Sequence, residues 1–145
     1  MATESDDSVR PAKNTGLTKD AGWEVGVRKT VAAPLPEVWE FLLGEGLSLW
    51  LGEGTLPRDK GASYEMADGV RGQVRGFADR QKLRVSWRPE DWPHDTILQV
   101  TVKEAPGGTT IGFHHEQLAD RDERRMMLGH WKNVVDDLAE ALRRG

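Results

Sequence analysis

The sequence predicts an α+β fold, in which one strand and two short helices precede about five antiparallel strands and one long final helix. Three observations support this prediction. Apolar and polar residues alternate over short stretches bounded by turn residues, which is typical of half-buried strands. Apolar residues recur at helical spacing over residues 121–143. The strands also follow one another directly, which favours α+β over alternating α/β organisation.

The first strand is expected over residues 23–31, where alternate positions are apolar. Pro36 suits the first position of the helix at 36–43, because the N–H that proline lacks would have no partner there, and Gly44 can end that helix. A second short helical stretch follows at 46–53, before Gly52 and Gly54 interrupt it.

The central strands are expected at 62–66, 70–77, 82–88, 96–104 and 109–118, with a loop at 89–95. Asp68-Gly69 predicts a hairpin turn, since both residues tolerate positive φ. Gly72 and Gly76, within one strand, are interpreted as bulges or bends that curve the sheet. The antiparallel sheet is therefore expected to be strongly curved.

The long helix has a clear beginning. Asp120 is a good N-cap, and Glu123 three residues later can complete a capping box. One face of the helix carries an apolar stripe that is expected to lie along the concave side of the sheet, made of Met127, Trp131, Val134, Val135, Leu138 and Leu142.

Composition narrows the class of protein. The sequence has no cysteine, which excludes disulfides, thiolate catalysis and cysteine-type zinc sites. A net charge of −4 gives no basic footprint for nucleic acid. No apolar run approaches the ~20 residues that span a bilayer, so membrane insertion is not expected. We expect a disordered N-terminal tail at 1–20, one domain at 21–145, and a soluble, cytoplasmic protein of bacterial type.

Stretches spread over residues 23–142 resemble one family. VAAPLPEVWEFL and GLSLWLGE resemble its first helices, GASYEMADGVRGQVRGFADRQKLRVSWRPEDW its central hairpins, and FHHEQLAD with HWKNVVDDLAEAL its last strand and helix. The family is that of the Hsp90-ATPase activator homologues, within the START-like superfamily of polyketide cyclases and lipid-transport proteins. The resemblance implies a helix-grip (START/Bet v 1-like) fold, with a curved antiparallel sheet wrapped on the long C-terminal helix. His130 departs from the pattern, because many relatives have glycine directly before the helix tryptophan.

Such a fold implies a cavity between the sheet and the long helix. Six tryptophans in a domain of this size predict a bulky core, an aromatic-lined pocket, or both. Ligand pockets are mostly apolar with a few placed polar groups. The alternation predicts the following lining, although these side chains can equally well only fill a core: Trp50, Tyr64, Trp87, Phe113, His115, Met127, Trp131 and Val135.

His115 is the candidate with chemistry of its own. It is in phase with Ile111 and Phe113 and should point inward, where an imidazole can orient a ligand, transfer a proton, or simply bond a neighbour in the core. No metal site is expected, because His114 and His115 lie on opposite sides of one strand. Ser63 and Ser86 are expected on outward faces, and no nucleophile motif is present. No cofactor and no catalytic residue are therefore predicted.

These observations lead to one leading hypothesis and two alternatives. The leading hypothesis is a module without catalytic machinery that binds a hydrophobic small molecule. The first alternative is an interaction protein that modulates a chaperone ATPase such as Hsp90. It rests on the resemblance and on a face predicted to carry Arg71, Arg75, Arg84 and Arg88, although 145 residues leave no room for the eukaryotic activator's separate chaperone-binding domain. The second alternative is a cyclase-type enzyme that uses His115 as acid or base, with Tyr64 nearby.

Overall fold

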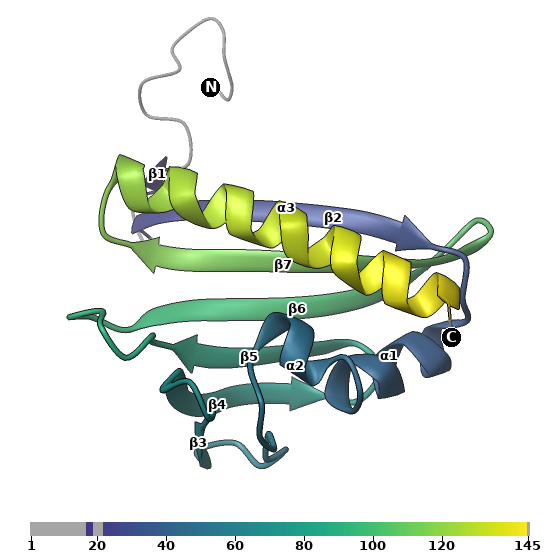
Figure 1. The fold of residues 1–145 in the computed structure, drawn as a ribbon, viewed down its shortest axis with the longest axis horizontal. Helices are drawn as coiled ribbons and strands as arrows, with labels where there is room; N and C mark the ends of the chain where they lie inside the picture. Colours follow the sequence, from purple (N-terminus) through teal and green to yellow (C-terminus); the bar gives the residue numbers. More distant parts are fainter. Residues whose placement is uncertain (1–16, 19–21, 145) are drawn as a thin grey trace, which may run out of the picture.

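A computed structural model describes residues 17–18 and 22–144, which form one antiparallel sheet with three helices on one of its faces (Figure 1). The sheet has seven strands in the order β1-β2-β7-β6-β5-β4-β3. The strands are β1 (Leu17–Thr18), β2 (Gly22–Val31), β3 (Ser63–Glu65), β4 (Arg71–Ala78), β5 (Lys82–Trp87), β6 (Thr96–Ala105) and β7 (Gly108–Leu118). The helices are α1 (Leu35–Leu43), α2 (Leu47–Trp50) and α3 (Arg121–Arg144).

The predicted α+β architecture and its helix-grip arrangement are confirmed. Each predicted strand and helix is present, with ends within three residues of those expected. The helix α3 runs along β2 and β7, while α1 and α2 lie beside it over the middle of the sheet (Figure 1). The two-residue strand β1 was not predicted, since it falls within the expected tail at 1–20, and it pairs with Trp23 and Gly22 of β2. The rest of that tail lies outside the described residues.

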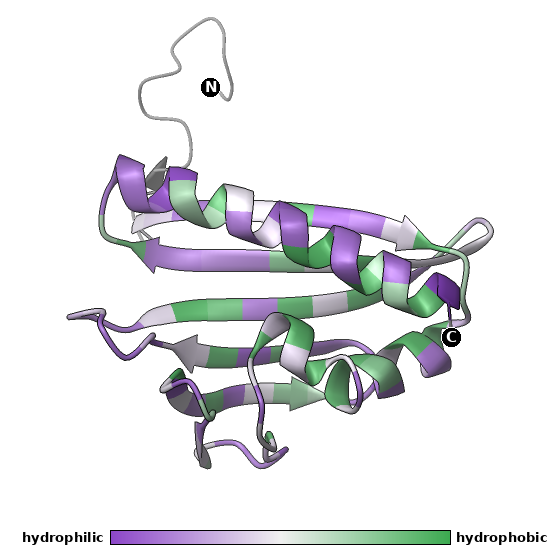
Figure 2. Cartoon of the chain, in the orientation of Figure 1, coloured by the Kyte–Doolittle hydropathy of each residue, from purple (hydrophilic) through white to green (hydrophobic). Residues whose placement is uncertain are grey.

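The core lies between the sheet and the helices. It takes alternate residues of β5, β6 and β7 and the predicted stripe of α3, apart from Leu142, which is half-buried. Figure 2 shows the consequence, with hydrophobic residues dominating α1, α2 and β6 while polar residues are interspersed along α3. The start of α3 is capped as predicted, because Asp120 Oδ1 accepts the Glu123 N–H at 2.8 Å. The Glu123 carboxylate accepts the Ala119 N–H at 2.8 Å, one residue before the cap.

Strand β4 bends across β5 at the predicted glycines. The register between these strands shifts between Val74 and Gly76, and a Cβ at Gly72 would lie 2.0 Å from the Ser86 carbonyl oxygen. This close approach covers Ser86, whose hydroxyl accepts the Gln73 N–H at 2.8 Å. The prediction that Ser86 faces outward was therefore wrong, because simple alternation does not describe a strand pair interrupted by a bulge.

The close approach at Gly72 leads to a test by substitution. Gly72→Ala should lower the free energy of unfolding by at least about 2 kcal/mol, because the new methyl group meets backbone that cannot rotate away. Gly129→Ala is the matched control. Nothing lies within 4 Å of a Cβ there, and alanine should stabilise α3 by about 0.5–1 kcal/mol. Urea unfolding followed by circular dichroism measures both, and equal stabilities would contradict this account of the bend.

Candidate ligand-binding site

The eight residues predicted to line a cavity are all buried and come from five elements. Trp50 ends α2, Tyr64 lies in β3, Trp87 ends β5, Phe113 and His115 lie in β7, and the remaining three, Met127, Trp131 and Val135, lie on one face of α3. Their inward orientation therefore agrees with the alternation. A role in binding a ligand stays a prediction.

Five of these side chains form what we call the aromatic cluster: Trp50, Trp87, Phe113, His115 and Trp131. At its centre the rings of Phe113 and Trp131 stack, with centroids 5.0 Å apart and planes 12° from parallel. Trp50 meets Phe113 at 5.8 Å on one side, and Trp87 meets Trp131 at 6.1 Å on the other. Such pairs contribute stability beyond their buried area, so the cluster ties α2, β5, β7 and α3 together.

A chain of hydrogen bonds crosses the cluster and fixes the state of His115. Trp131 Nε1 donates to His115 Nδ1 at 3.0 Å. The Thr96 hydroxyl donates to the Trp87 carbonyl oxygen at 2.7 Å, so its oxygen can only accept from His115 Nε2, also at 2.7 Å. His115 is therefore the neutral tautomer with its proton on Nε2.

The surroundings of His115 keep it neutral. Burial, with a smaller contribution from His130, lowers the pKa of His115 to about 3. A second proton on Nδ1 would also point at the Trp131 N–H, a donor facing a donor. Both ring nitrogens are thus occupied by protein groups, and the geometry gives His115 a structural role in this cluster.

Tyr64 does not join His115. Its hydroxyl donates to the Ser86 carbonyl oxygen at 2.7 Å, and burial, with a smaller contribution from Asp95, raises its pKa above the ordinary value. The pairing of His115 with Tyr64 that the cyclase alternative requires is therefore not formed. Thr96, which sequence reasoning missed, is the polar partner of His115 instead.

One polar atom of the cluster has no partner. Trp87 is 6% exposed, and within residues 17–18 and 22–144 its indole nitrogen Nε1 meets no hydrogen-bond acceptor. Buried donors are nearly always paired, and leaving one unpaired costs about 1–3 kcal/mol. This N–H is therefore the open polar position of the site.

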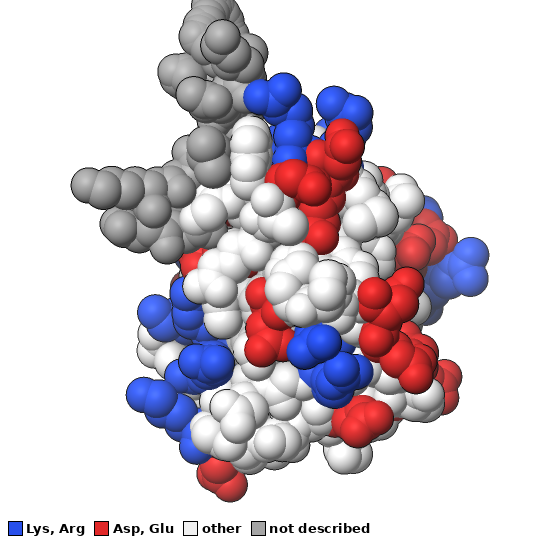
Figure 3. All heavy atoms as spheres, turned by 90° about the vertical axis from the view of Figure 1, so that its left-hand side faces the viewer, with Lys and Arg blue, Asp and Glu red and all other residues white. Residues whose placement is uncertain are grey.

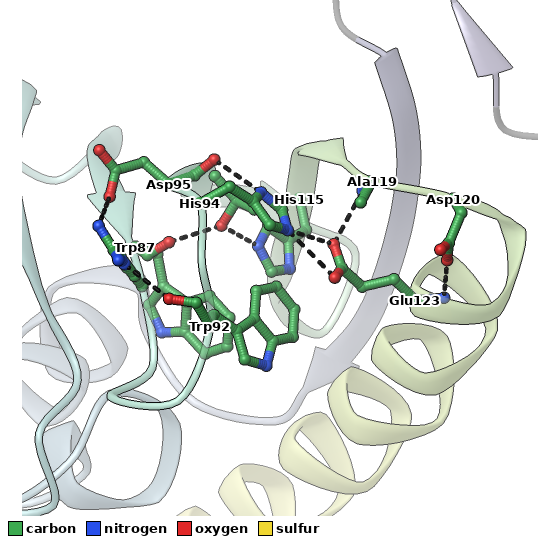
Figure 4. Close-up of polar contacts among 10 residues, drawn as sticks. Trp87, Trp92, His94, Asp95, His115, Ala119, Asp120 and Glu123 are labelled. Carbon is green, nitrogen blue, oxygen red and sulfur yellow. Dashed lines mark hydrogen bonds and ion pairs between the residues drawn. The ribbon is translucent and has the colours of Figure 1, made fainter.

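The cluster is covered by residues 88–95, which we call the β5–β6 loop. Its Trp92 ring meets Trp87 edge-on at 5.3 Å and stacks on His94 at 5.4 Å. The loop is fastened to the start of α3, because His94 Nε2 lies 3.0 Å from the Glu123 carboxylate (Figure 4). Within the loop, Arg88 Nε donates to the Trp92 carbonyl oxygen at 2.8 Å. Trp92 and His94 were predicted only as loop residues, and the missed signal was an aromatic residue in an otherwise polar loop.

The end of the molecule that carries this loop is shown in Figure 3. Uncharged surface on that face is interspersed with acidic and basic groups. Trp92 is half-buried at this end of the molecule, so its ring is partly exposed to solvent and also contacts Trp87 of the aromatic cluster.

Several surface hollows of the described residues lie away from most of the aromatic cluster. A hollow of about 690 Å³ runs between β2 and the end of α3, and one of about 700 Å³ between α1 and the end of α3. A third, of about 350 Å³, is lined by Gly112, Thr101 and Phe113, where β2, β6 and β7 adjoin. Apart from Phe113, no predicted lining residue borders these hollows. The eight side chains are themselves buried, and the rings of the aromatic cluster contact one another.

The predicted arginine face is partly neutralised. Arg84 pairs with Glu116 at 2.8 Å, and Arg88 contacts Asp95 at 3.9 Å. Among residues 17–18 and 22–144, no three metal-binding side chains gather to hold an ion. No helix of that part of the chain is long and apolar enough to cross a membrane.

Solved structures share this fold at low sequence identity. CalU16 from Micromonospora echinospora is 19% identical, with a TM-score of 0.70 over 81% of this chain and 74% of its own. DynU16, a protein of the dynemicin biosynthetic locus, is 23% identical, with a TM-score of 0.71 over 83% of this chain. This chain spans only 47% of DynU16. The Aha1 dimer from Colwellia psychrerythraea is 16% identical, with a TM-score of 0.64 over 82% of this chain and 95% of its own.

Family membership rests on a separate comparison. No curated protein matches this sequence. A family model described as "Activator of Hsp90 ATPase homolog 1-like protein" matches residues 32–143, which include α1, the whole hairpin region and nearly all of α3. The chain therefore belongs to the Activator of Hsp90 ATPase homolog 1-like family.

Proposed function

We propose that this protein binds a small, mainly apolar molecule at the aromatic cluster. The observation that carries the proposal is the continuous row of contacting rings that leads from half-buried Trp92 to buried Trp50. Ligand sites in proteins are lined mainly by such side chains, with a few polar groups among them. The proposal includes the eight predicted lining residues and a cytoplasmic setting in a bacterial cell.

Because the cluster is filled, binding requires the β5–β6 loop to move. The loop is fastened to the rest of the protein by the edge-on contact of Trp92 with Trp87 and by the polar contact of His94 with Glu123 at 3.0 Å. One ring pair and one polar contact each contribute only about 0.5–1.5 kcal/mol, so opening the loop costs less than disrupting the core. One structural neighbour, DynU16, belongs to a biosynthetic locus, a setting in keeping with a small-molecule ligand.

The proposal is tested by fluorescence titration with a fatty acid, a flavonoid and a fused-ring polyketide. At least one should change the tryptophan emission saturably. Trp92→Leu should weaken that ligand by about tenfold or more, because it removes the ring that leads to Trp87.

Trp23→Leu is the control, since Trp23 is also half-buried but contacts Arg121 instead of the cluster. The affinity of the Trp23→Leu variant for the same ligand should stay within about twofold of that of the wild type. Equal effects of the two substitutions would place binding outside the aromatic cluster. No saturable change with any compound would reject the proposed function.

The alternative function is modulation of an Hsp90-type ATPase. The family match favours it. Adding the protein to bacterial Hsp90 and measuring ATP hydrolysis discriminates between the two: a rate that changes saturably supports the alternative, and an unchanged rate at saturating protein rejects it. We propose binding and not cyclase-type catalysis because both nitrogens of His115 are bonded within the protein.

A further inference from the structure

We propose that the indole N–H of Trp87 is the specificity contact of this site, donating a hydrogen bond to an uncharged oxygen on the edge of a flat, fused-ring ligand. This inference rests on the proposed function and names the class of ligand that the site takes. It places the polar end of the ligand within hydrogen-bond distance of one atom, Trp87 Nε1.

The other buried tryptophans show that this N–H is exceptional. Trp39 Nε1 donates to Asp79 at 2.9 Å, Trp50 Nε1 to the Leu42 carbonyl oxygen at 2.8 Å, and Trp131 Nε1 to His115 at 3.0 Å. Among the four buried tryptophans of the described residues, Trp87 alone has no acceptor. An acceptor that satisfies it must therefore come from outside this part of the chain.

The geometry around Trp87 favours a planar ligand. Its ring meets Trp92 at 88° and His115 at 89°, both edge-on contacts, with centroids 5.3 and 4.9 Å away. A flat ring that enters beside Trp92 when the β5–β6 loop opens can make the same kind of edge-on contact with Trp87. The ligand ring would then add to the favourable ring contacts that Trp87 and Trp92 already make.

The surroundings also favour an uncharged acceptor over a carboxylate. The ring neighbours of Trp87 are Trp92, Trp131 and His115, and burial keeps His115 neutral by lowering its pKa to about 3. Placing an anion among uncharged rings carries a large desolvation cost. A ketone, ether or phenol oxygen meets the N–H without that cost.

The test compares two ligands of one shape, 1-tetralone and tetralin, which differ by a carbonyl group in place of a methylene group. Wild-type protein should bind 1-tetralone about five- to tenfold more tightly, the effect of one hydrogen bond to an otherwise unpaired donor. In Trp87→Phe, which keeps a ring but lacks the N–H, the two affinities should become equal within about twofold.

Trp39→Phe is the matched control. It also removes the indole N–H of a buried tryptophan, but one that is bonded to Asp79 and lies outside the aromatic cluster, so the preference for 1-tetralone should remain. A second measurement observes wild-type protein saturated with ligand by ¹H–¹⁵N spectroscopy. The indole signal of Trp87 is identified as the one missing from Trp87→Phe. It should move downfield with 1-tetralone and not with tetralin.

The outcomes separate the two proposals. If both ligands bind wild-type protein equally and neither moves the Trp87 indole signal downfield, this inference is overturned while the proposed function stands, and the N–H is satisfied by an ordered water only. If neither these two ligands nor the wider panel binds, both proposals fail. A preference for 1-tetralone that persists in Trp87→Phe also overturns the assignment to Trp87.

Discussion

Replacing Trp131 with alanine should lower the free energy of unfolding by about 3–5 kcal/mol, a large part of the stability of a domain of this size. Trp131 is 0% exposed, stacks on Phe113 at 5.0 Å and donates to His115 at 3.0 Å. The substitution therefore leaves a cavity in the aromatic cluster and an unpaired nitrogen on His115. Chemical denaturation followed by far-ultraviolet circular dichroism measures the loss.

Met126→Ala is the control for this substitution, because Met126 lies on the same helix but is 55% exposed. This substitution should change the free energy of unfolding by no more than about 0.5 kcal/mol. A loss below about 1 kcal/mol for Trp131→Ala would show that the cluster is loosely packed, contrary to the contacts described here.

Acid should weaken the fold through His115. The pKa of His115 falls from 6.5 to about 3 on folding, so between these values the unfolded chain binds a proton that the native protein excludes. Stability then rises with pH, is complete above about pH 6.5, and is lost progressively as the pH falls toward 3. From pH 7 to pH 5 this one residue should lower the free energy of unfolding by about 2 kcal/mol.

The measurement compares unfolding free energies of wild type and His115→Gln at several pH values, so that contributions common to both proteins cancel. The difference between them should shrink by about 2 kcal/mol from pH 7 to pH 5. Parallel pH profiles would mean that His115 accepts a proton in the native state and that the hydrogen-bond chain from Trp131 to Thr96 is not maintained.

Much of the fold followed from residue spacing, because buried strands and amphipathic helices impose periods of 2 and 3.6 on apolar positions. The stripe of α3 from Met127 to Leu138 and the inward set in β7 were predicted correctly for this reason. The burial of Ser86 was not predicted, because the approach of Gly72 to the Ser86 carbonyl oxygen depends on how β4 crosses β5. Two-residue β1 carries too few residues to show a period.

The candidate site was predictable in its apolar part and not in its polar part. Alternation placed Trp87, Phe113 and His115 inward, but the partners of the two His115 ring nitrogens, Thr96 and Trp131, come from distant positions. Thr96 reaches His115 because β6 and β7 pair, and His94 reaches Glu123 because the β5–β6 loop folds onto α3. Neither pairing has a periodic signature, and the unpaired state of Trp87 Nε1 emerges only once every neighbour is placed.

The most direct test of the central claim, that the aromatic cluster is a ligand site, is a titration of wild-type protein with 1-tetralone followed by the indole N–H signals of its six tryptophans. The structure predicts saturable shifts of the Trp87, Trp92 and Trp131 signals, while those of Trp23 and Trp39, which contact other residues, remain in place. Shifts confined to Trp23 or Trp39, or an unchanged spectrum, would contradict the claim.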